Sequence, residues 1–330
     1  MDMQTKRARL EKLYVSSPRI KGILAEIEHC RLDSKDAQEP RSMLLIGQSG
    51  AGKTTIIKKY MRDFPEKETD ERRIIPVFQS ELPGKVTCKA LAQTLLTEMG
   101  ADDPESGNLT SITKRLARLI KECEVELIIL DEFQHLLQSE SAPYMAGVRD
   151  WIKSLINATK VPILLVGTPG SERILYKDPQ LKRRFPVVEE LAYFNWVDDA
   201  KDYRAFLAMV DKGLPFDEPA NLADPHRAIR FLVASEGMIG NTMMLIYETG
   251  RRALEQGLPG LTDKMFAAAF DKHLLRESRV KRNPWGMTVD QLEKVIAAWA
   301  DEAKRRPTKT KVKAAAEGSA LAGKKEKKDS

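Results

Sequence analysis

The segment 47-GQSGAGKTT-55 has the residue types and the spacing of a phosphate-binding loop. It matches the pattern GxxxxGK[ST], in which glycines let backbone N–H groups turn toward phosphate oxygens at the start of a helix. Lys53 would then reach the terminal phosphates, and the hydroxyl of Thr54 would hold Mg²⁺. The segment predicts nucleotide binding, with ATP and Mg²⁺ as cofactors, and its candidate ligands are Gly47, Gln48, Ser49, Gly50, Ala51, Gly52, Lys53, Thr54 and Thr55.

An acidic pair follows the apolar run at the start of 127-LIILDEFQHL-136. Asp131 is placed to orient Mg²⁺ and joins the cofactor ligands, while Glu132 is placed to activate the water that attacks the γ-phosphate. Such a pair is also suited to cap the N-terminus of a helix, so that alternative stays open. Beside a phosphate-binding loop, the second acid favours hydrolysis over phosphate transfer to a small molecule.

A third segment, 161-VPILLVGTP-169, ends another apolar run with a hydroxyl. Thr168 is expected beside Asp131 at the edge of the sheet, where its hydroxyl could report the γ-phosphate. The alternative is an ordinary threonine that starts a turn before Pro169.

Two adjacent arginines end a predicted helix in 180-QLKRRFPV-187. Cations are favourable at the C-terminus of a helix by themselves, which is one explanation for Arg183 and Arg184. The other is that one of them reaches the nucleotide of a neighbouring subunit as an arginine finger, which requires an oligomer.

Short apolar runs alternate with helix-like stretches as far as residue 191 or so. Strands that are apolar throughout are buried on both faces, which is typical of a parallel sheet covered by helices. The predicted fold class is therefore α/β, of a nucleotide-binding kind. We expect strands at 42–46, 73–79, 126–130, 161–167 and 187–191, and helices near 18–29, from 53, at 86–98, 110–122 and 146–157, and from 170.

Beyond residue 197 the pattern is helical only. Helices are expected at 198–211, 225–236, 241–256, 262–276 and 288–306. The segment 283-NPWG-286 breaks the pattern, and Trp285 either packs there or is an exposed hook for a partner. The expected domains are a helical entry segment at 1–40, the nucleotide-binding domain at 41–196, a helical lid at 197–278, a linker and helix at 279–306, and a disordered basic tail at 307–330.

The net charge of +6 is concentrated at the C-terminus, because residues 301–330 hold ten Lys or Arg against five acids. The tail is expected either to solubilise the protein or to bind phosphates. No apolar run is long enough to span a bilayer and the N-terminus is charged, so we expect a cytoplasmic protein without a membrane partner. Three dispersed cysteines predict neither a disulfide framework nor a zinc site.

In chain order, GQSGAGKT, LIILDEFQHL, LVGTP and 178-DPQLKRRF-185 resemble the motifs of an AAA+ ATPase. The entry 14-YVSSPRIKGILAEIE-28, the DEFQHLL segment, the spacing from VGTP to QLKRRF and the segment 235-SEGMIGNTMMLIYETGRRALEQG-257 more closely resemble the TniB/TnsC family of transposition regulators, which are MuB/IstB-like. The resemblance covers roughly residues 12–275. It implies a P-loop AAA+ parallel sheet flanked by helices and followed by a small all-helical lid.

The resemblance also implies roles for the motif residues. Gly47, Gly52, Lys53 and Thr54 would be Walker A, Asp131 and Glu132 Walker B, and Thr168 sensor 1. Arg184 would be the finger rather than Arg183, because it directly precedes the Phe of the RF pair. The segment 240-GNTM-243 lacks the sensor 2 arginine, as TniB-like proteins do, which fits slow hydrolysis stimulated by a partner or by DNA.

As a function, the resemblance implies an ATPase that assembles on double-stranded DNA as a homo-oligomeric ring or filament, hexameric per turn. It would recruit a DDE-type transposase and work with a TniQ-like target-selection protein, with or without an RNA-guided targeting complex. Two alternatives stay open: a DnaC/IstB-like helicase loader, and a nucleotide-switched adaptor of the STAND kind with little turnover.

Candidate DNA contacts lie on 80-SELPGKVTCKA-90 and 114-KRLAR-118, which would face the pore of a ring in the geometry of the family. Charge runs on helices are most often solvated faces, so that explanation stays open too. The residues that could reach phosphates are Lys85, Thr87, Lys89, Lys114 and Arg115.

Overall fold

The computed structural model describes residues 2–15, 17–34, 39–70, 72–84, 86–137, 141–176 and 178–305. The predicted disordered tail at 307–330 lies outside these residues. The chain forms two compact units. One, the sheet unit, comprises Tyr14–Tyr193 and Met238–Gly240; the other, the helical unit, comprises the residues up to Leu13, Phe194–Gly237 and the described residues from Asn241 onward.

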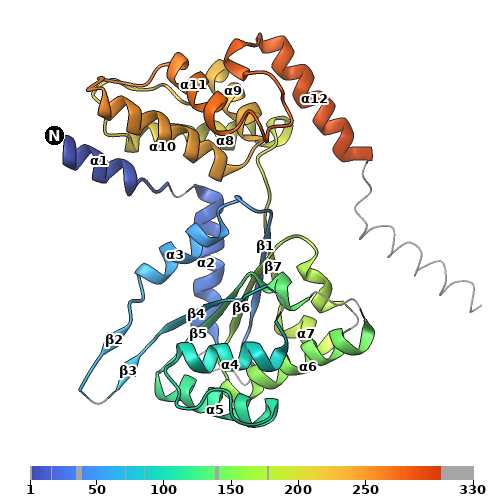
Figure 1. Ribbon diagram of the computed structural model, residues 1–330. Coiled ribbons are helices and arrows are strands. Elements are labelled where there is room, and N and C mark those ends of the chain that lie inside the picture. The colour runs from blue at the N-terminus through green and yellow to red at the C-terminus, as the bar shows by residue number, and fades with distance from the viewer. Residues whose placement is uncertain are drawn as a thin grey trace, which may run out of the picture. The chain divides into compact units, whose positions relative to one another are not determined.

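The sheet unit is built on five parallel strands in the order β4-β5-β6-β1-β7. Parallel strands need crossover connections, and helices supply them here (Figure 1). The predicted α/β fold class is therefore confirmed. The strands are β1 Met43–Gly47, β4 Val77–Glu81, β5 Leu127–Asp131, β6 Ile163–Gly167 and β7 Val187–Leu191.

The strand expected at 73–79 is divided by Pro76. Proline cannot donate to a strand ladder, and the chain turns at this point. Arg73–Ile74 (β3) pairs antiparallel with Lys67–Glu68 (β2) in a hairpin, and only Val77–Glu81 joins the main sheet. Both halves of this run are therefore extended as expected, but they are two strands rather than one, and only the second belongs to the parallel sheet.

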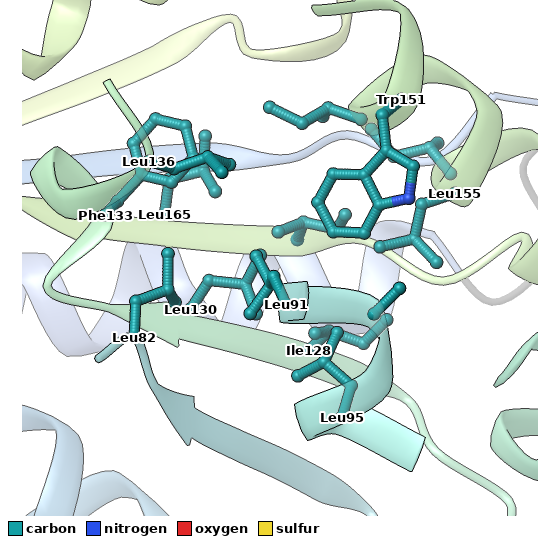
Figure 2. Packing of buried hydrophobic residues seen from close by; sticks show 14 of the residues in the cluster. Leu82, Leu91, Leu95, Ile128, Leu130, Phe133, Leu136, Trp151, Leu155 and Leu165 are labelled. Atoms are coloured by element: carbon teal, nitrogen blue, oxygen red, sulfur yellow. The ribbon is translucent and has the colours of Figure 1, made fainter. Parts of the chain in front are cut away.

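The central strands bury side chains on both faces in strict alternation. On one face, Ile128, Leu130 and Leu165 pack under α4 (Cys88–Glu98), α5 (Leu109–Glu122) and α6 (Ala142–Thr159). Figure 2 shows Leu91 and Leu95 of α4 and Trp151 and Leu155 of α6 against these strands. On the other face, Leu45, Ile129 and Val166 pack under α2 (Pro18–Asp33) and α3 (Lys53–Arg62).

The helix expected from residue 170 is two short elements instead. A 3-10 turn, η2, covers Ser171–Leu175, and α7 covers Pro179–Arg184. Asp178 and Pro179 explain the break, because Asp178 caps the new helix by accepting the N–H of Leu181 at 2.9 Å, and proline suits the first helical position.

The helical unit contains α8 (Trp196–Gly213), α9 (Pro225–Ser235), α10 (Ile239–Glu255) from its third residue, α11 (Asp263–His273), the 3-10 turn η3 (Pro284–Gly286) and α12 (Val289–Arg305). No single helix among the described residues is long and apolar enough to cross a membrane, and only the bent pair α9 and α10 meets that test by length and composition.

An N-terminal helix that the sequence did not predict, α1 (Met3–Glu11), also belongs to the helical unit. Arg9 donates to the carbonyls of Gly213 and Lys212 at the end of α8, at 3.0 and 3.2 Å. Leu10 is buried against Gly250 of α10, where a Cβ would lie only 3.0 Å from the leucine. The expected 1–40 segment is therefore divided, with α1 in the helical unit and α2 in the sheet unit.

Trp285 packs within the helical unit, which decides between the two alternatives for it. Its ring is stacked on Phe266 at 5.9 Å and edge-on to Phe231 at 5.3 Å between centroids. Its Nε1 donates to Asp263 at 3.2 Å. The hook alternative is wrong, because the large apolar ring is satisfied by other aromatic rings and its polar atom by a carboxylate.

We expect Trp285→Ala to lower the free energy of unfolding of the helical unit by about 3 kcal/mol, since it removes a large ring from an aromatic cluster. Trp285→Phe, which keeps a ring, should cost less than half of that. Urea unfolding followed by circular dichroism measures both. An alanine variant as stable as the parent would contradict the packing assignment.

Candidate nucleotide site

The phosphate-binding loop needs its glycines for different reasons. Gly50 and Gly52 have φ values of +75° and +103°, in the left-handed region that favours glycine. Gly47, at the end of β1, lies so close to β7 that a Cβ would sit 2.8 Å from the carbonyl oxygen of Leu191. The loop shape is therefore specified by sequence and by close packing of two strands.

Hydrogen bonds within the sheet unit hold four successive carbonyls of this loop. The ammonium of Lys53 donates to Gly47 at 2.7 Å and to Gln48 at 3.1 Å. The hydroxyl of Tyr193 donates to the carbonyl of Ser49 at 2.7 Å, and the N–H of Gly240 to that of Gly50 at 3.0 Å. Sequence analysis missed Tyr193 and the main-chain role of Gly240, because both lie far along the chain.

Lys53 is buried although it carries the charge that a phosphate would meet. Burial lowers the pKa of this lysine, and the nearby carboxylates Glu132 and Asp131 act in the opposite direction. The charged form is thus poorly compensated in the protein alone, and an anion at the loop would stabilise it. Gln48, Ser49, Gly50, Thr54 and Thr55 are exposed, whereas Ala51 is buried.

Asp131 ends β5 across from the first turn of α3. The residue is 1% exposed, and its Oδ2 lies 3.5 Å from the hydroxyl of Thr54. Burial raises the pKa of Asp131, and the charge of Glu132 adds to the rise, while the N–H of Glu132 lowers it. Paired carboxylate and hydroxyl oxygens of this kind are the ligands that Mg²⁺ prefers, so the residues present fit that cation.

Glu132 adopts a left-handed backbone conformation, with φ +55°. It precedes the 3-10 turn η1 (Phe133–Leu136), and its side chain makes no capping hydrogen bond there. The helix-cap alternative for the acidic pair is therefore not what the structure shows. Instead the Glu132 N–H donates to Asp131 at 2.8 Å, and its carboxylate accepts from the side-chain amide of Gln134.

Thr168 follows β6 directly, and β6 is hydrogen-bonded to both β5 and β1. This strand order puts Thr168 between the ends of the strands that carry Asp131 and the phosphate-binding loop. Its N–H donates to Gln134 at 3.1 Å, and its carbonyl accepts from Ser171 at 3.0 Å, so it also starts a turn as the alternative proposed. The two explanations for Thr168 are compatible.

The two arginines at the end of α7 differ in exposure. The side chain of Arg183 is 82% exposed, with Glu39 at 3.6 Å. That of Arg184 is 12% exposed and donates to Asn157 at 2.9 Å and to the carbonyl of Lys153 at 3.4 Å. Arg184 lines an open surface hollow with Asp150, Lys153, Ser154, Asn157, Ala158 and Gln180.

The predicted DNA contacts are not equivalent. Thr87 caps α4 by accepting the N–H of Ala90 at 3.2 Å. Arg115 is half-buried and donates to the carbonyls of Asp102, Asp103 and Ser106. Lys89 and Lys114 are exposed on α4 and α5, whereas Lys85 lies outside the described residues.

The family model described as "Bacterial TniB protein" matches residues 7–196. No curated protein matches the chain in sequence. Among solved structures, the chain is similar to the ORC2 protein of Aeropyrum pernix in ADPNP-ADP complexes, at 18% identity and a TM-score of 0.56, with 81% of this chain and 71% of that chain covered. It is also similar to the ORC1 protein of Aeropyrum pernix in complex with DNA, at 17% identity and a TM-score of 0.56, with 81% and 69% covered.

A third similar structure is Cdc6p from Pyrobaculum aerophilum, at 12% identity and a TM-score of 0.53, with 79% of this chain and 69% of that chain covered. At such identities the likeness shows the fold alone. That fold is the AAA+ arrangement that the motifs predicted, with the sheet flanked by helices.

The buried charge of Asp131 leads to a prediction about stability. A raised pKa means that the folded state binds the proton more tightly than the unfolded state, so the carboxylate reduces stability at every pH above its folded pKa. We expect Asp131→Asn to raise the Tm of the nucleotide-free protein at pH 7.5 by about 2–4 °C. A gain of roughly 1 kcal/mol in the free energy of unfolding gives a change of this size.

Asp178→Asn is the matched control, because the pKa of Asp178 is lowered. Burial by itself would raise this pKa, but the hydrogen bonds from the Leu181 N–H and the ammonium of Lys153 outweigh burial. Its carboxylate therefore adds stability above the unfolded pKa, which is lost as the pH falls through the folded pKa. Its asparagine variant should have a lower Tm. Differential scanning calorimetry measures both Tm values. Equal Tm changes of the same sign in the two variants would contradict the opposite roles assigned to the carboxylates of Asp131 and Asp178.

Proposed function

The chain belongs to the TniB family, and from that premise we propose that it is an ATP-dependent DNA-binding regulator of transposition. It would bind ATP and Mg²⁺, assemble on double-stranded DNA as a homo-oligomer, and recruit a DDE-type transposase to the DNA that it covers. Hydrolysis to ADP and phosphate would end that state. A TniQ-like protein, alone or within an RNA-guided complex, is the expected partner for choosing the target.

The observation that carries ATP hydrolysis is the convergence of Thr54, Asp131 and Glu132 beside the phosphate-binding loop. Lys53 and the loop N–H groups would bind the phosphates, and Thr54 and Asp131 would hold Mg²⁺. The cation would neutralise charge on the phosphates and polarise the γ-phosphate. Glu132 then accepts the proton of the attacking water, for which it needs a free carboxylate oxygen.

DNA binding is supported by family membership, by the exposed cations Lys89 and Lys114, and by the fold shared with an ORC1 protein described in complex with DNA. Contacts of this kind go to phosphates and carry no sequence information. The proposal therefore predicts binding to duplex DNA of any sequence, with an affinity that falls as salt rises.

The function is tested by the ATP dependence of DNA binding. We expect the parent to bind a random-sequence duplex tightly with ATP and Mg²⁺ and at least tenfold more weakly without nucleotide, measured by fluorescence anisotropy. Lys53→Ala should not bind ATP and should behave like the nucleotide-free parent. Glu132→Gln should bind ATP and remain on DNA, since it stops turnover with a loss of about 10² or more in kcat.

Three outcomes would contradict the proposal. DNA affinity independent of nucleotide would argue against an ATP-gated assembly. Hydrolysis by Glu132→Gln at the parent rate would remove the catalytic assignment. Association of the ATP-bound protein with a replicative helicase rather than with a transposase would favour the helicase loader.

The same proposal requires a shared active site, and we expect Arg184 to complete it. Its guanidinium is already oriented by Asn157 and Lys153 at the wall of an open hollow, so less side-chain entropy is lost when a neighbour's phosphates approach. Arg183 is exposed, is paired with Glu39 and does not line the hollow, so it serves as the control.

Arg184→Ala should bind ATP normally and lower kcat by about 10³, while Arg183→Ala lowers it less than tenfold. Mixing Arg184→Ala with Lys53→Ala should restore part of the activity, because each subunit supplies what the other lacks. Steady-state phosphate release measures this. A mixture as inactive as its components, with both folded and shown to co-assemble, would argue against a shared site, and a larger effect of Arg183 would make it the finger.

A further inference from the structure

Gln134 makes contacts that the Walker and sensor motifs do not explain. Its amide nitrogen donates to the carboxylate of Glu132, and its amide oxygen accepts the N–H of Thr168 at 3.1 Å. One side chain therefore joins the expected general base, which precedes η1, to the residue that follows the neighbouring strand β6. Sequence analysis quoted this glutamine only as part of the DEFQHL segment.

Packing of the neighbouring residues restricts the position of the Gln134 side chain. Its neighbours Phe133 and Leu136 are fully buried, and Figure 2 shows them packed near Leu165 of β6. These two anchors fix the 3-10 turn that carries Gln134. On the far side, Gly167 leaves room for the amide, because a Cβ there would sit 3.1 Å from the amide oxygen.

Other groups near the Glu132 carboxylate do not replace this contact. The imidazole of His135 lies 3.9 Å from the same oxygen, which is beyond hydrogen-bond distance. Lys53 is directed to the carbonyls of Gly47 and Gln48, and Asp131 accepts from the main chain of Glu132. Among the described residues, the amide of Gln134 is thus the side-chain donor within hydrogen-bond distance of this carboxylate.

We propose that Gln134 is a positioning residue that holds the carboxylate of Glu132 and couples it to the backbone of Thr168. The inference rests on the proposed ATP hydrolysis and deepens it. With one oxygen of Glu132 held by the amide, the other is left to face water. A displacement of Thr168 by a bound γ-phosphate would then be transmitted through a planar amide to the general base.

The chemical step itself is unchanged by this residue. The oxygen of water bonds to the γ-phosphorus, the bond from that phosphorus to the bridging oxygen breaks, and ADP leaves with the electron pair. The proton of the water passes to the free oxygen of Glu132. Gln134 neither gives nor takes a proton, so its effect is on kcat through the position of the base.

Two substitutions distinguish the hydrogen bond that Gln134 donates to Glu132 from the one that it accepts from Thr168. Gln134→Met keeps the length and removes both hydrogen bonds. Gln134→Glu keeps an oxygen that can accept the Thr168 N–H but sets a second carboxylate against Glu132. The matched control is Gln93→Met on α4, whose amide donates to the carbonyl of Glu105 at 3.0 Å, remote from the nucleotide.

In the full-length protein with ATP, Mg²⁺ and duplex DNA, we expect both Gln134 variants to lower kcat at least tenfold. Their Kd for a fluorescent ATP analogue should stay within about threefold of the parent, since the phosphate contacts are intact. Gln93→Met should change neither quantity more than twofold. In the Glu132→Gln background, Gln134→Met should add no further loss, because the group that it positions is already gone.

The proposal is overturned if Gln134→Met keeps the parent kcat, if Gln134→Glu does so, or if kcat, nucleotide affinity and Tm all fall together, which would make the residue structural. Full additivity with Glu132→Gln would overturn it as well. Failure of the proposed function would look different. The parent protein itself would then show no ATP hydrolysis that depends on Glu132, with or without DNA.

Discussion

Parallel pairing of β6 with β1 on one side and β5 on the other is the constraint on which the candidate site depends. The carboxyl ends of parallel strands meet at one edge of a sheet, so residues that follow three separate strands are brought together. The phosphate-binding loop, Asp131 and Thr168 meet in this way although more than a hundred residues separate the first from the last. Helices on both faces keep the strands buried and hold the edge in place.

The site contains two side chains, Lys53 and Asp131, whose charged forms are disfavoured by burial. Burial lowers the pKa of Lys53 and raises that of Asp131, so each resists the charged form that nucleotide and Mg²⁺ binding would use. The opposite holds for Asp178 of the same unit. Asp178 combines burial with a helix N–H and two cations, and its pKa is lowered. The charged form of Asp178 is thus stabilised by its partners, whereas burial disfavours the charged forms of Lys53 and Asp131, as expected where a ligand completes the electrostatics.

Nucleotide chemistry and assembly would be connected through short elements rather than through the sheet itself. The turn η1 carries Gln134 and directly follows Glu132, and the short helix α7 carries Arg183 and Arg184. Both elements rest on one buried cluster, which includes Phe133, Leu181 and Phe185. A change at the γ-phosphate and a change at a neighbouring subunit would therefore both act on the packing of this cluster. A closely packed core favours discrete arrangements over gradual deformation.

Local patterns in the sequence were enough to predict most of the elements and to single out most residues of the candidate site. Apolar runs that alternate with helix-like stretches identified four strands of the main sheet and part of the fifth. The motifs identified the phosphate-binding loop, the acidic pair and Thr168. Both signals are local, because backbone hydrogen bonding and phosphate geometry act over a few neighbouring residues. Features that depend on residues far apart in the chain became visible only in the folded structure. It placed α1 in the helical unit, divided the strand near Pro76, packed Trp285 against other rings and set Gln134 between Glu132 and Thr168. These contacts follow from strand order and packing, which no local pattern encodes.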